Sequence, residues 1–188
     1  MKTFNPSPVH SLLAGLVLAT ASLSTQAAPA EDLPQAKSVI VDRSIPAKQL
    51  AAMALAARRY YAFWNTGEER YAEAALAPDF TDRTLPAGRP QGKEGPLFAS
   101  RNFRAAVPDL HAEVEEMLLV GDRVVGRLHF TGHFTGQFGS GVNAKQGDGR
   151  PIDFIATDIY RIREKRIADN WHLEDNLTLL QQLGVIGH

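Results

Sequence analysis

The stretch RIADNWHLEDNLTLLQQLG, from Arg166 to Gly184, decides the fold because it predicts a strand followed directly by a short helix. Side chains alternate between the two faces of a strand. One face of this strand would carry Ile167, Asp169, Trp171, Leu173 and Asp175. The other face would carry Asn170, His172 and Glu174. Because the first face is mostly apolar, we expect it to face the core, and we expect His172 and Glu174 to be surface or dimer contacts.

Asp175 is an acid at the end of this apolar face, and two roles are open to it. A carboxylate beside Trp171 and Leu173 in an apolar pocket would have a raised pKa, which suits a general acid or base. An Asp directly before NLTLL is also a good N-cap for the terminal helix, because its side chain can accept a backbone N–H. The spacing alone favours the N-cap.

The N-terminus predicts export. Residues 1–27 contain one lysine, a short apolar run and an alanine-rich end, an order typical of a cleavable secretory signal peptide. We expect cleavage after Ala27 or Ala28, a linker or N-terminal arm at residues 28–43, and a single domain at residues 44–188. The protein would then be periplasmic or secreted.

Charge and composition limit the partners of the mature chain. It would have 20 − 1 = 19 basic and 21 acidic residues, a net charge of −2. A nearly neutral domain has no general attraction for nucleic acid or an anionic membrane, so we expect neither as a partner. The chain has no cysteine, which excludes disulfides and thiolate metal sites. Since HExxH, phosphate-loop and dinucleotide motifs are also missing, neither a metal nor a cofactor is predicted.

Hydrophobic periodicity predicts three helices, then about four antiparallel strands, then a terminal helix. The predicted helices span residues 47–64, 68–76 and 97–108. The strands span residues 110–120, 123–138, 152–162 and 167–175, and the last helix spans 176–184. Helices that precede a run of strands indicate an α+β domain. A curved sheet with helices over one face would leave room for a small-molecule pocket between the layers.

A second acid, Asp158, interrupts another apolar stripe. In the strand IDFIATDIYRI, it shares a face with Phe154, Ala156, Tyr160 and Ile162. Asp158 could be a pocket carboxylate or could orient a histidine. It could also be paired with an arginine or lie exposed on the outer face. The pattern does not choose between these roles.

His133 lies in a polar stripe on the preceding strand. One face of that strand would carry Arg127, His129, Thr131 and His133, opposite Leu128 and Phe130. The stripe could line the cavity, with His133 as a proton shuttle. A solvated outer face is slightly favoured, and Gly132 and Gly136 permit bulges that would change the alternation.

The whole pattern resembles a known family. The segments WNTG, PDF, PDLHAEVEEMLLVGDRVVGRLHFTGHFTGQF and DIYRIREKRIADNWHLEDNLTLLQQLG together are similar to the SnoaL-like polyketide (ester) cyclase family. That family belongs to the nuclear transport factor 2-like superfamily. The resemblance covers about Leu50 to Gly184 and implies a cone-shaped α+β barrel, with a curved antiparallel sheet covered by the three N-terminal helices.

The resemblance also implies a chemistry. In the family, an acidic residue near the C-terminus is the general acid/base of an intramolecular aldol ring closure that needs no cofactor. The Trp-x-x-x-Asp match carries this role to Asp175, and so favours it over the N-cap. His133 or Arg127 would stabilise the enolate oxygen, and Asp158 would complete the catalytic set. The residues expected to bind substrate are Trp171, Arg127, Tyr61, Trp64 and Tyr160.

We therefore expect an exported, cofactor-free enzyme that acts on a hydrophobic, carbonyl-bearing small molecule. One alternative is a periplasmic protein that binds such a molecule without catalysis. Another is a dimerisation module, and a second copy of the chain is a possible partner in either case.

Overall fold

The computed structural model describes Met1 and residues 31–187 of the chain. The predicted signal peptide and its cleavage site lie outside the described residues. From Asp32 onward the chain forms one compact unit. This unit therefore begins before the predicted domain boundary at residue 44.

The unit is built on a six-stranded sheet with the order β1-β3-β4-β7-β8-β2. Neighbours from β3 to β8 pair antiparallel, whereas β1 pairs parallel with β3 and β2 pairs parallel with β8. The strands are β1 Ser38–Val41, β2 Leu76–Asp82, β3 His111–Val120, β4 Arg123–Phe134, β7 Arg150–Arg163 and β8 Arg166–Glu174. A separate small hairpin consists of β5 Gln137–Phe138 and β6 Lys145–Gln146.

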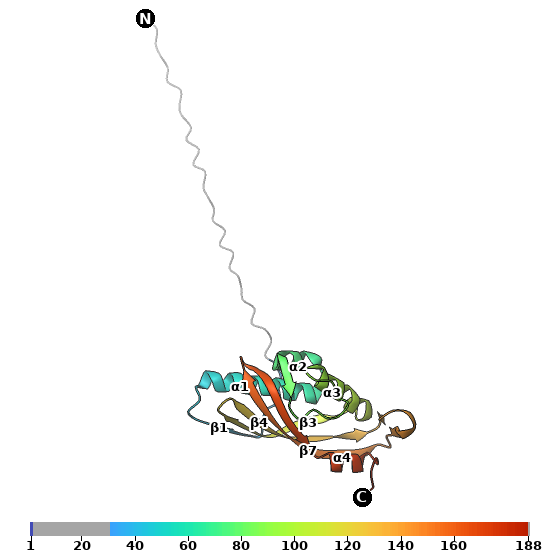
Figure 1. The fold of residues 1–188 in the computed structure, drawn as a ribbon. Coiled ribbons are helices and arrows are strands. Elements are labelled where there is room, and N and C mark those ends of the chain that lie inside the picture. The colour runs from blue at the N-terminus through green and yellow to red at the C-terminus, as the bar shows by residue number, and fades with distance from the viewer. Residues whose placement is uncertain (2–30, 188) are drawn as a thin grey trace. The chain divides into compact units, whose positions relative to one another are not determined.

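Three helices lie over one side of the curved sheet, as Figure 1 shows. They are α1 Ala47–Thr66, α2 Glu69–Ala75 and α3 Glu94–Ala106. The terminal helix, α4 Asn176–Gln182, packs against β7, where the Gln182 side chain hydrogen-bonds to the backbone of Asp153. The predicted α+β class, with three helices before a curved sheet, is confirmed.

Both edges of the sheet differ from the prediction. Residues 38–41, which were expected in a linker or arm, form β1, and Leu33 just before them is buried in the core. The segment after α2, which was expected to end a helix, forms β2. Pro78 fits there because β2 is an edge strand, where a missing backbone N–H leaves no ladder bond unmade.

The core forms where α1 meets the inward face of the sheet. Tyr60, Tyr61 and Phe63 of α1 are buried, and Tyr160 of β7 packs against both tyrosine rings at centroid distances of 5.6 and 5.8 Å. The helix ends at Gly67, whose left-handed backbone lets its N–H donate to the Phe63 carbonyl. Aromatic packing thus fixes α1 across the strands that carry the site.

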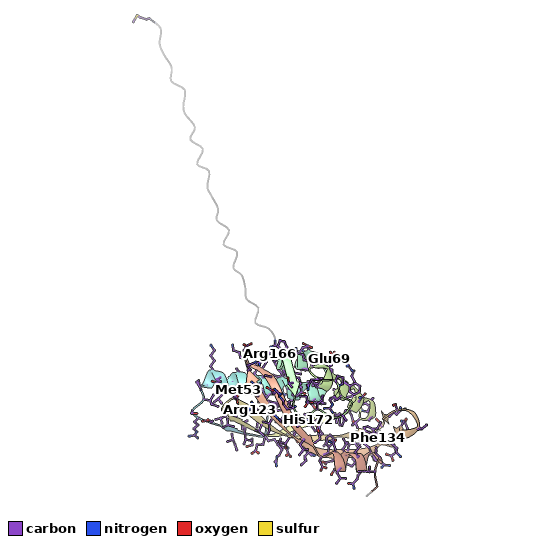
Figure 2. All side chains as sticks on the ribbon, in the orientation of Figure 1. Met53, Glu69, Arg123, Phe134, Arg166 and His172 are labelled. Carbon is purple, nitrogen blue, oxygen red and sulfur yellow. The ribbon has the colours of Figure 1, made fainter. Side chains whose placement is uncertain are left out.

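Strands β4 and β7 run the length of the sheet and alternate regularly. Figure 2 labels Arg123, the first residue of β4, and Phe134, its last. Along β7, every second residue from Ile152 to Tyr160 is buried, and Asp158 belongs to this inward set. The alternation predicted for β7 is confirmed.

Strand β8 contains one extra residue. Ile162 pairs with Ile167, but Arg161 pairs with Asp169, so Ala168 has no partner on β7. Such a β-bulge shifts every later pair by one position. Without the bulge Trp171 would lie opposite Asp158, whereas with it His172 does. Since directly paired residues point to the same face, Asn170, His172 and Glu174 point inward with Asp158.

Gly126 of β4 allows Tyr61 to reach its place in the core. A Cβ at this position would lie 2.1 Å from the Tyr61 hydroxyl oxygen. We predict that Gly126→Ala destabilises the protein by about 1–3 kcal/mol because it overpacks a rigid site. Urea unfolding measures this loss, and Gly187→Ala is the control because a Cβ there meets nothing within 4 Å. Equal stability of the two variants would contradict the packing described here.

Candidate active site

A pocket lies between the sheet and the helices and holds about 550 Å³ of space, its opening included. Strands β4, β7 and β8 supply one wall, and the rest comes from α1, α3, the end of β2 with the loop after it, and the segment before β3. The lining residues are Tyr60, Trp64, Asp82, Arg89, Pro96, Phe103, Leu110, Phe130, Phe154, Ala156, Asp158, Asn170, His172 and Glu174.

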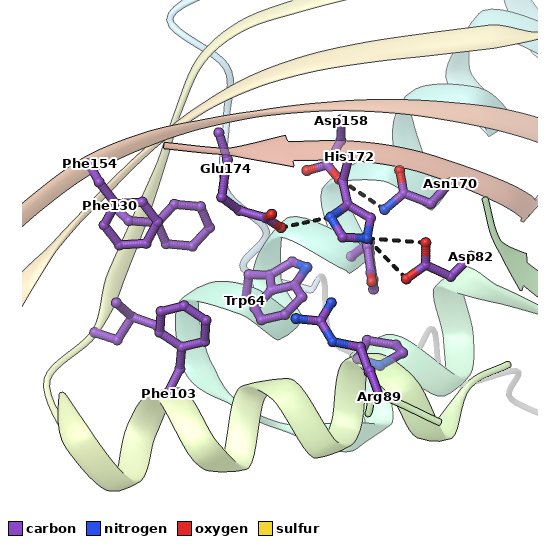
Figure 3. A pocket seen from close by; sticks show the side chains of 14 residues that line it. Trp64, Asp82, Arg89, Phe103, Phe130, Phe154, Asp158, Asn170, His172 and Glu174 are labelled. Carbon is purple, nitrogen blue, oxygen red and sulfur yellow. Dashed lines mark hydrogen bonds and ion pairs between the residues drawn. The ribbon is translucent and has the colours of Figure 1, made fainter. Parts of the chain in front are cut away.

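One end of the pocket is aromatic (Figure 3). The ring of Phe154 stacks on Phe130 at 5.0 Å and on Phe103 at 6.0 Å, and Trp64 meets Phe130 edge-on at 6.4 Å. These rings come from β4, β7, α3 and α1, so the layers of the fold converge here. Such a surface holds a flat, apolar carbon skeleton well.

The other end is charged, and His172 is its centre. Its Nδ1 lies 2.8 Å from Glu174 Oε1, and its Nε2 lies 3.0 and 3.1 Å from the two carboxylate oxygens of Asp82. The three residues form the clamp drawn with dashed lines in Figure 3. Asp82 ends β2, while His172 and Glu174 lie on β8, so the clamp also joins two neighbouring strands.

The clamp holds His172 as a cation. Burial acts to lower the pKa of His172, but hydrogen bonds to Asp82 and Glu174 outweigh it and raise the pKa to about 10. Burial acts to raise the pKa of each carboxyl, yet the His172 hydrogen bond and charge lower the pKa of both Asp82 and Glu174 overall. At neutral pH the imidazolium therefore donates both N–H groups and has no proton acceptor function.

Asp158 is the acid that remains free of a cation. It is 5% exposed, lines the pocket from β7, and accepts a hydrogen bond of 2.9 Å from Asn170 Nδ2. Burial raises its pKa to about 6, while the Asn170 hydrogen bond and the His172 charge oppose this rise. Near neutral pH such a carboxyl exchanges protons readily, as a general acid/base must.

Asp175 does not lie where the sequence and the resemblance placed it. The bulge in β8 directs Glu174, rather than Asp175, into the pocket. Asp175 is instead the N-cap of α4: its carboxylate accepts the Thr178 N–H at 3.1 Å and the Thr178 hydroxyl at 2.8 Å. The Thr178 hydrogen bonds lower the pKa of Asp175. Asp175 is therefore not one of the carboxylates that line the pocket, contrary to the expectation.

Three other predicted residues also lie outside the pocket lining. Arg127 is on the outer face of β4, 3.2 Å from Glu115, and His133 is exposed and 2.7 Å from Asp109. Trp171 lies on the outer face of β8 beneath the Arg123 guanidinium. The outer-face alternative for the β4 stripe is therefore the one the structure shows.

The remaining predicted site residues lie in the pocket lining or directly behind it. Asp158 and Trp64 are among the residues that line it. Tyr61 and Tyr160 are fully buried behind the lining, and their hydroxyls have no aligned hydrogen-bond partner among residues 31–187. Their rings support the wall rather than meet a ligand.

Four charged residues of the pocket escaped the sequence analysis: Asp82, Arg89, His172 and Glu174. His172 and Glu174 were assigned to the surface because the bulge at Ala168 leaves no clear trace in the sequence. Asp82 and Arg89 lie between the second and third predicted helices, where the sequence analysis assigned no element. The one available signal of a polar inward face was the alternation of Asn170, His172 and Glu174 along the strand.

Two features are absent from the residues that the structure describes. No cluster of three or more His, Cys, Asp or Glu residues there could hold a metal ion. No helix in the same part of the chain is long and apolar enough to cross a membrane.

A curved sheet, three covering helices and a pocket between them that holds a buried acid define a nuclear transport factor 2-like domain. Comparison with solved structures supports this class. A proposed polyketide cyclase from Bacillus cereus ATCC 10987 is 44% identical, with a TM-score of 0.75, over 84% of this chain and 97% of that one. IdmH, a proposed polyketide cyclase from Streptomyces antibioticus, is 27% identical, with a TM-score of 0.58, over 73% and 99% of the two chains.

The sequence profile described as SnoaL-like polyketide cyclase matches residues 54–183. This chain therefore belongs to the SnoaL-like polyketide cyclase family. No match was found among curated proteins.

The clamp should make the stability of the folded protein depend on pH. Because folding raises the pKa of His172 from 6.5 to about 10, its contribution is fully present below pH 6.5 and is lost as the pH rises through 10. We predict that His172→Gln lowers the free energy of unfolding by about 3 kcal/mol near pH 6, since two buried carboxylates lose their cation. The deficit should shrink as the pH approaches 10.

Urea unfolding at several pH values measures this deficit. His133→Gln is the matched control, because the His133 side chain is 59% exposed and its ion pair is on the surface. A deficit for His172→Gln that stays constant over the whole range would show that the clamp carries no net charge interaction.

Proposed function

We propose that this protein is a cofactor-independent cyclase that uses Asp158 as its general acid/base on an apolar, carbonyl-bearing small molecule. The observation that supports this is the position of Asp158: a buried carboxyl without a paired cation, between an aromatic wall and a charged clamp. Family membership and the names of similar structures support cyclisation as the reaction.

The proposed reaction is an intramolecular aldol closure. The Asp158 carboxylate takes a proton from a carbon next to a carbonyl, and the C–H electron pair becomes the enolate. The enolate carbon then attacks a second carbonyl of the same molecule, which forms the new C–C bond. Asp158 returns its proton to the resulting alkoxide, so the enzyme ends in its starting state. No further reactant is needed.

The other residues of the pocket would position the substrate and the Asp158 carboxyl. The rings of Phe103, Phe130 and Phe154 would hold the folded substrate so that the reacting carbons meet, which is a proximity effect. The clamp around His172 keeps two acids ionised and occupied, so neither competes with Asp158 for the substrate proton. Asn170 fixes the Asp158 carboxyl through its amide N–H.

The partner of the pocket is, in this proposal, a hydrophobic small molecule, and nucleic acid is not a partner. We also propose that the protein is exported, because residues 1–27 have the order of a signal peptide. The substrate would then be met outside the cytoplasm.

The role of Asp158 can be tested before the natural substrate is known. A suitable probe is 2-tetralone, an apolar bicyclic ketone whose α-protons exchange with deuterium when a base removes them. We predict that the wild-type protein accelerates this exchange in D₂O, and that the rate rises with pH through about 6 as Asp158 ionises. Asp158→Asn should reduce the rate to that of buffer. Proton NMR of the probe measures each rate.

Asp175→Asn is the matched control, since Asn also serves well as an N-cap. It should exchange the probe at the wild-type rate. Full activity of Asp158→Asn together with loss in Asp175→Asn would reverse the assignment. Binding of the probe without any exchange would favour a non-catalytic binding protein.

Export has its own test. Expression of the full chain in a Gram-negative host should give a periplasmic protein whose intact mass matches a start at residue 28 or 29. A cytoplasmic protein that retains residues 1–27 would contradict the proposed localisation.

A further inference from the structure

Arg89 reaches into the charged end of the pocket from the loop between β2 and α3. Its backbone N–H donates to the Pro86 carbonyl at 3.1 Å, which closes a tight turn. Its side-chain stem passes the start of α3 at Gly95, where a Cβ would lie 3.6 Å from the Arg89 Cγ and Cδ atoms. Figure 3 shows the guanidinium beside Trp64, facing the clamp. The loop therefore presents a cation to the pocket.

The Arg89 guanidinium has no hydrogen bond or ion pair with any of residues 31–187, although it is only partly exposed. The other cation of the pocket lining, His172, is held by two carboxylates. The Arg89 charge is close enough to help lower the pKa of both Asp82 and Glu174. Arg89 is thus the cation of the described lining that can still accept an anionic partner.

The charges of the lining suggest which partner this is. Asp82 and Glu174 balance His172 and Arg89, so the pocket is neutral when Asp158 is protonated and carries one negative charge when it is ionised. Proton removal from a substrate carbon moves that negative charge from the Asp158 carboxylate to a substrate oxygen. A cation without a partner at this end stabilises the charge in its new position.

We propose that Arg89 is a catalytic residue that donates an N–H to the enolate oxygen of the substrate. The site is then selective for carbonyl compounds that become oxyanions in the reaction. As the C–H bond breaks, the proton goes to Asp158, the electron pair enters the enolate, and the charge on oxygen meets the guanidinium. This inference rests on the proposed function. It gives Arg89 the stabilisation of the enolate oxygen that was expected of Arg127 or His133, which lie outside the pocket.

The inference can be tested by binding alone. The chain has two tryptophans, and Trp171 lies on the outer face, so Trp171→Phe leaves Trp64 as a fluorescent reporter in the pocket. In that background, Asp158→Asn reproduces the neutral acid of the enolate state. The probes are 4-nitrophenolate, whose oxyanion resembles an enolate, and 4-nitroanisole, its neutral methyl ether. Both are titrated at slightly alkaline pH, where the nitrophenol is ionised.

We expect the phenolate to bind at least about tenfold more tightly than the ether, which is typical of one charge-assisted hydrogen bond. Arg89→Met should abolish this preference and leave the affinity for the ether unchanged, which also shows that the pocket is intact. Arg127→Met is the matched control and should retain the preference, because Arg127 lies on the outer face.

Two results would overturn the inference: a preference that survives Arg89→Met, or no phenolate binding to the protein that keeps Arg89. The result is separable from the test of Asp158, because it needs no turnover. An Arg89-dependent preference without any deuterium exchange would leave Arg89 as an oxyanion-binding residue and contradict only the proposed catalysis.

Discussion

The register of β8 is the constraint on which the site depends. A two-residue turn joins β7 to β8, and uninterrupted pairing from that turn would place Trp171 and Leu173 opposite Asp158 and Ala156. The unpaired residue Ala168 shifts this pairing by one position. As a result a histidine and a glutamate enter the pocket, while Leu173 becomes 75% exposed. A single extra residue in one strand therefore exchanges an apolar lining for a charged one.

The charged end is stable because its groups neutralise one another, and Asp158 is the exception. Burial of a carboxylate without a cation is costly, and folding raises the pKa of Asp158 from 3.8 to about 6. The folded protein thus loses stability as the pH rises through this interval, by roughly 3 kcal/mol when complete. Well-packed aromatic neighbours offset such a cost, and a group kept in this unfavourable state is typical of an active site.

The sequence was sufficient to predict the elements whose hydrophobic residues recur with a regular period. The helical spacing of α1 and the alternation along β7 could be derived, because each depends on local pattern alone. The alternation placed Asp158 on one face with Phe154 and Tyr160, but it did not show that this face points inward. Strand β2 was missed because its proline argues against a strand unless the strand is known to lie at an edge. The clamp was missed for a different reason. A bulge is set by how two strands pair, so the sequence of one strand is not enough to predict it.

Asp175 shows why a matching motif is weaker evidence than a matching position in space. The Trp-x-x-x-Asp spacing is preserved, but both residues lie on the side of β8 away from the pocket, and the acid caps α4 through Thr178. Asp158 has the burial, the raised pKa and the contact with the pocket that were expected of Asp175. Because chemistry depends on where a carboxyl lies and on which charges surround it, we propose the acid/base role for the residue with that environment.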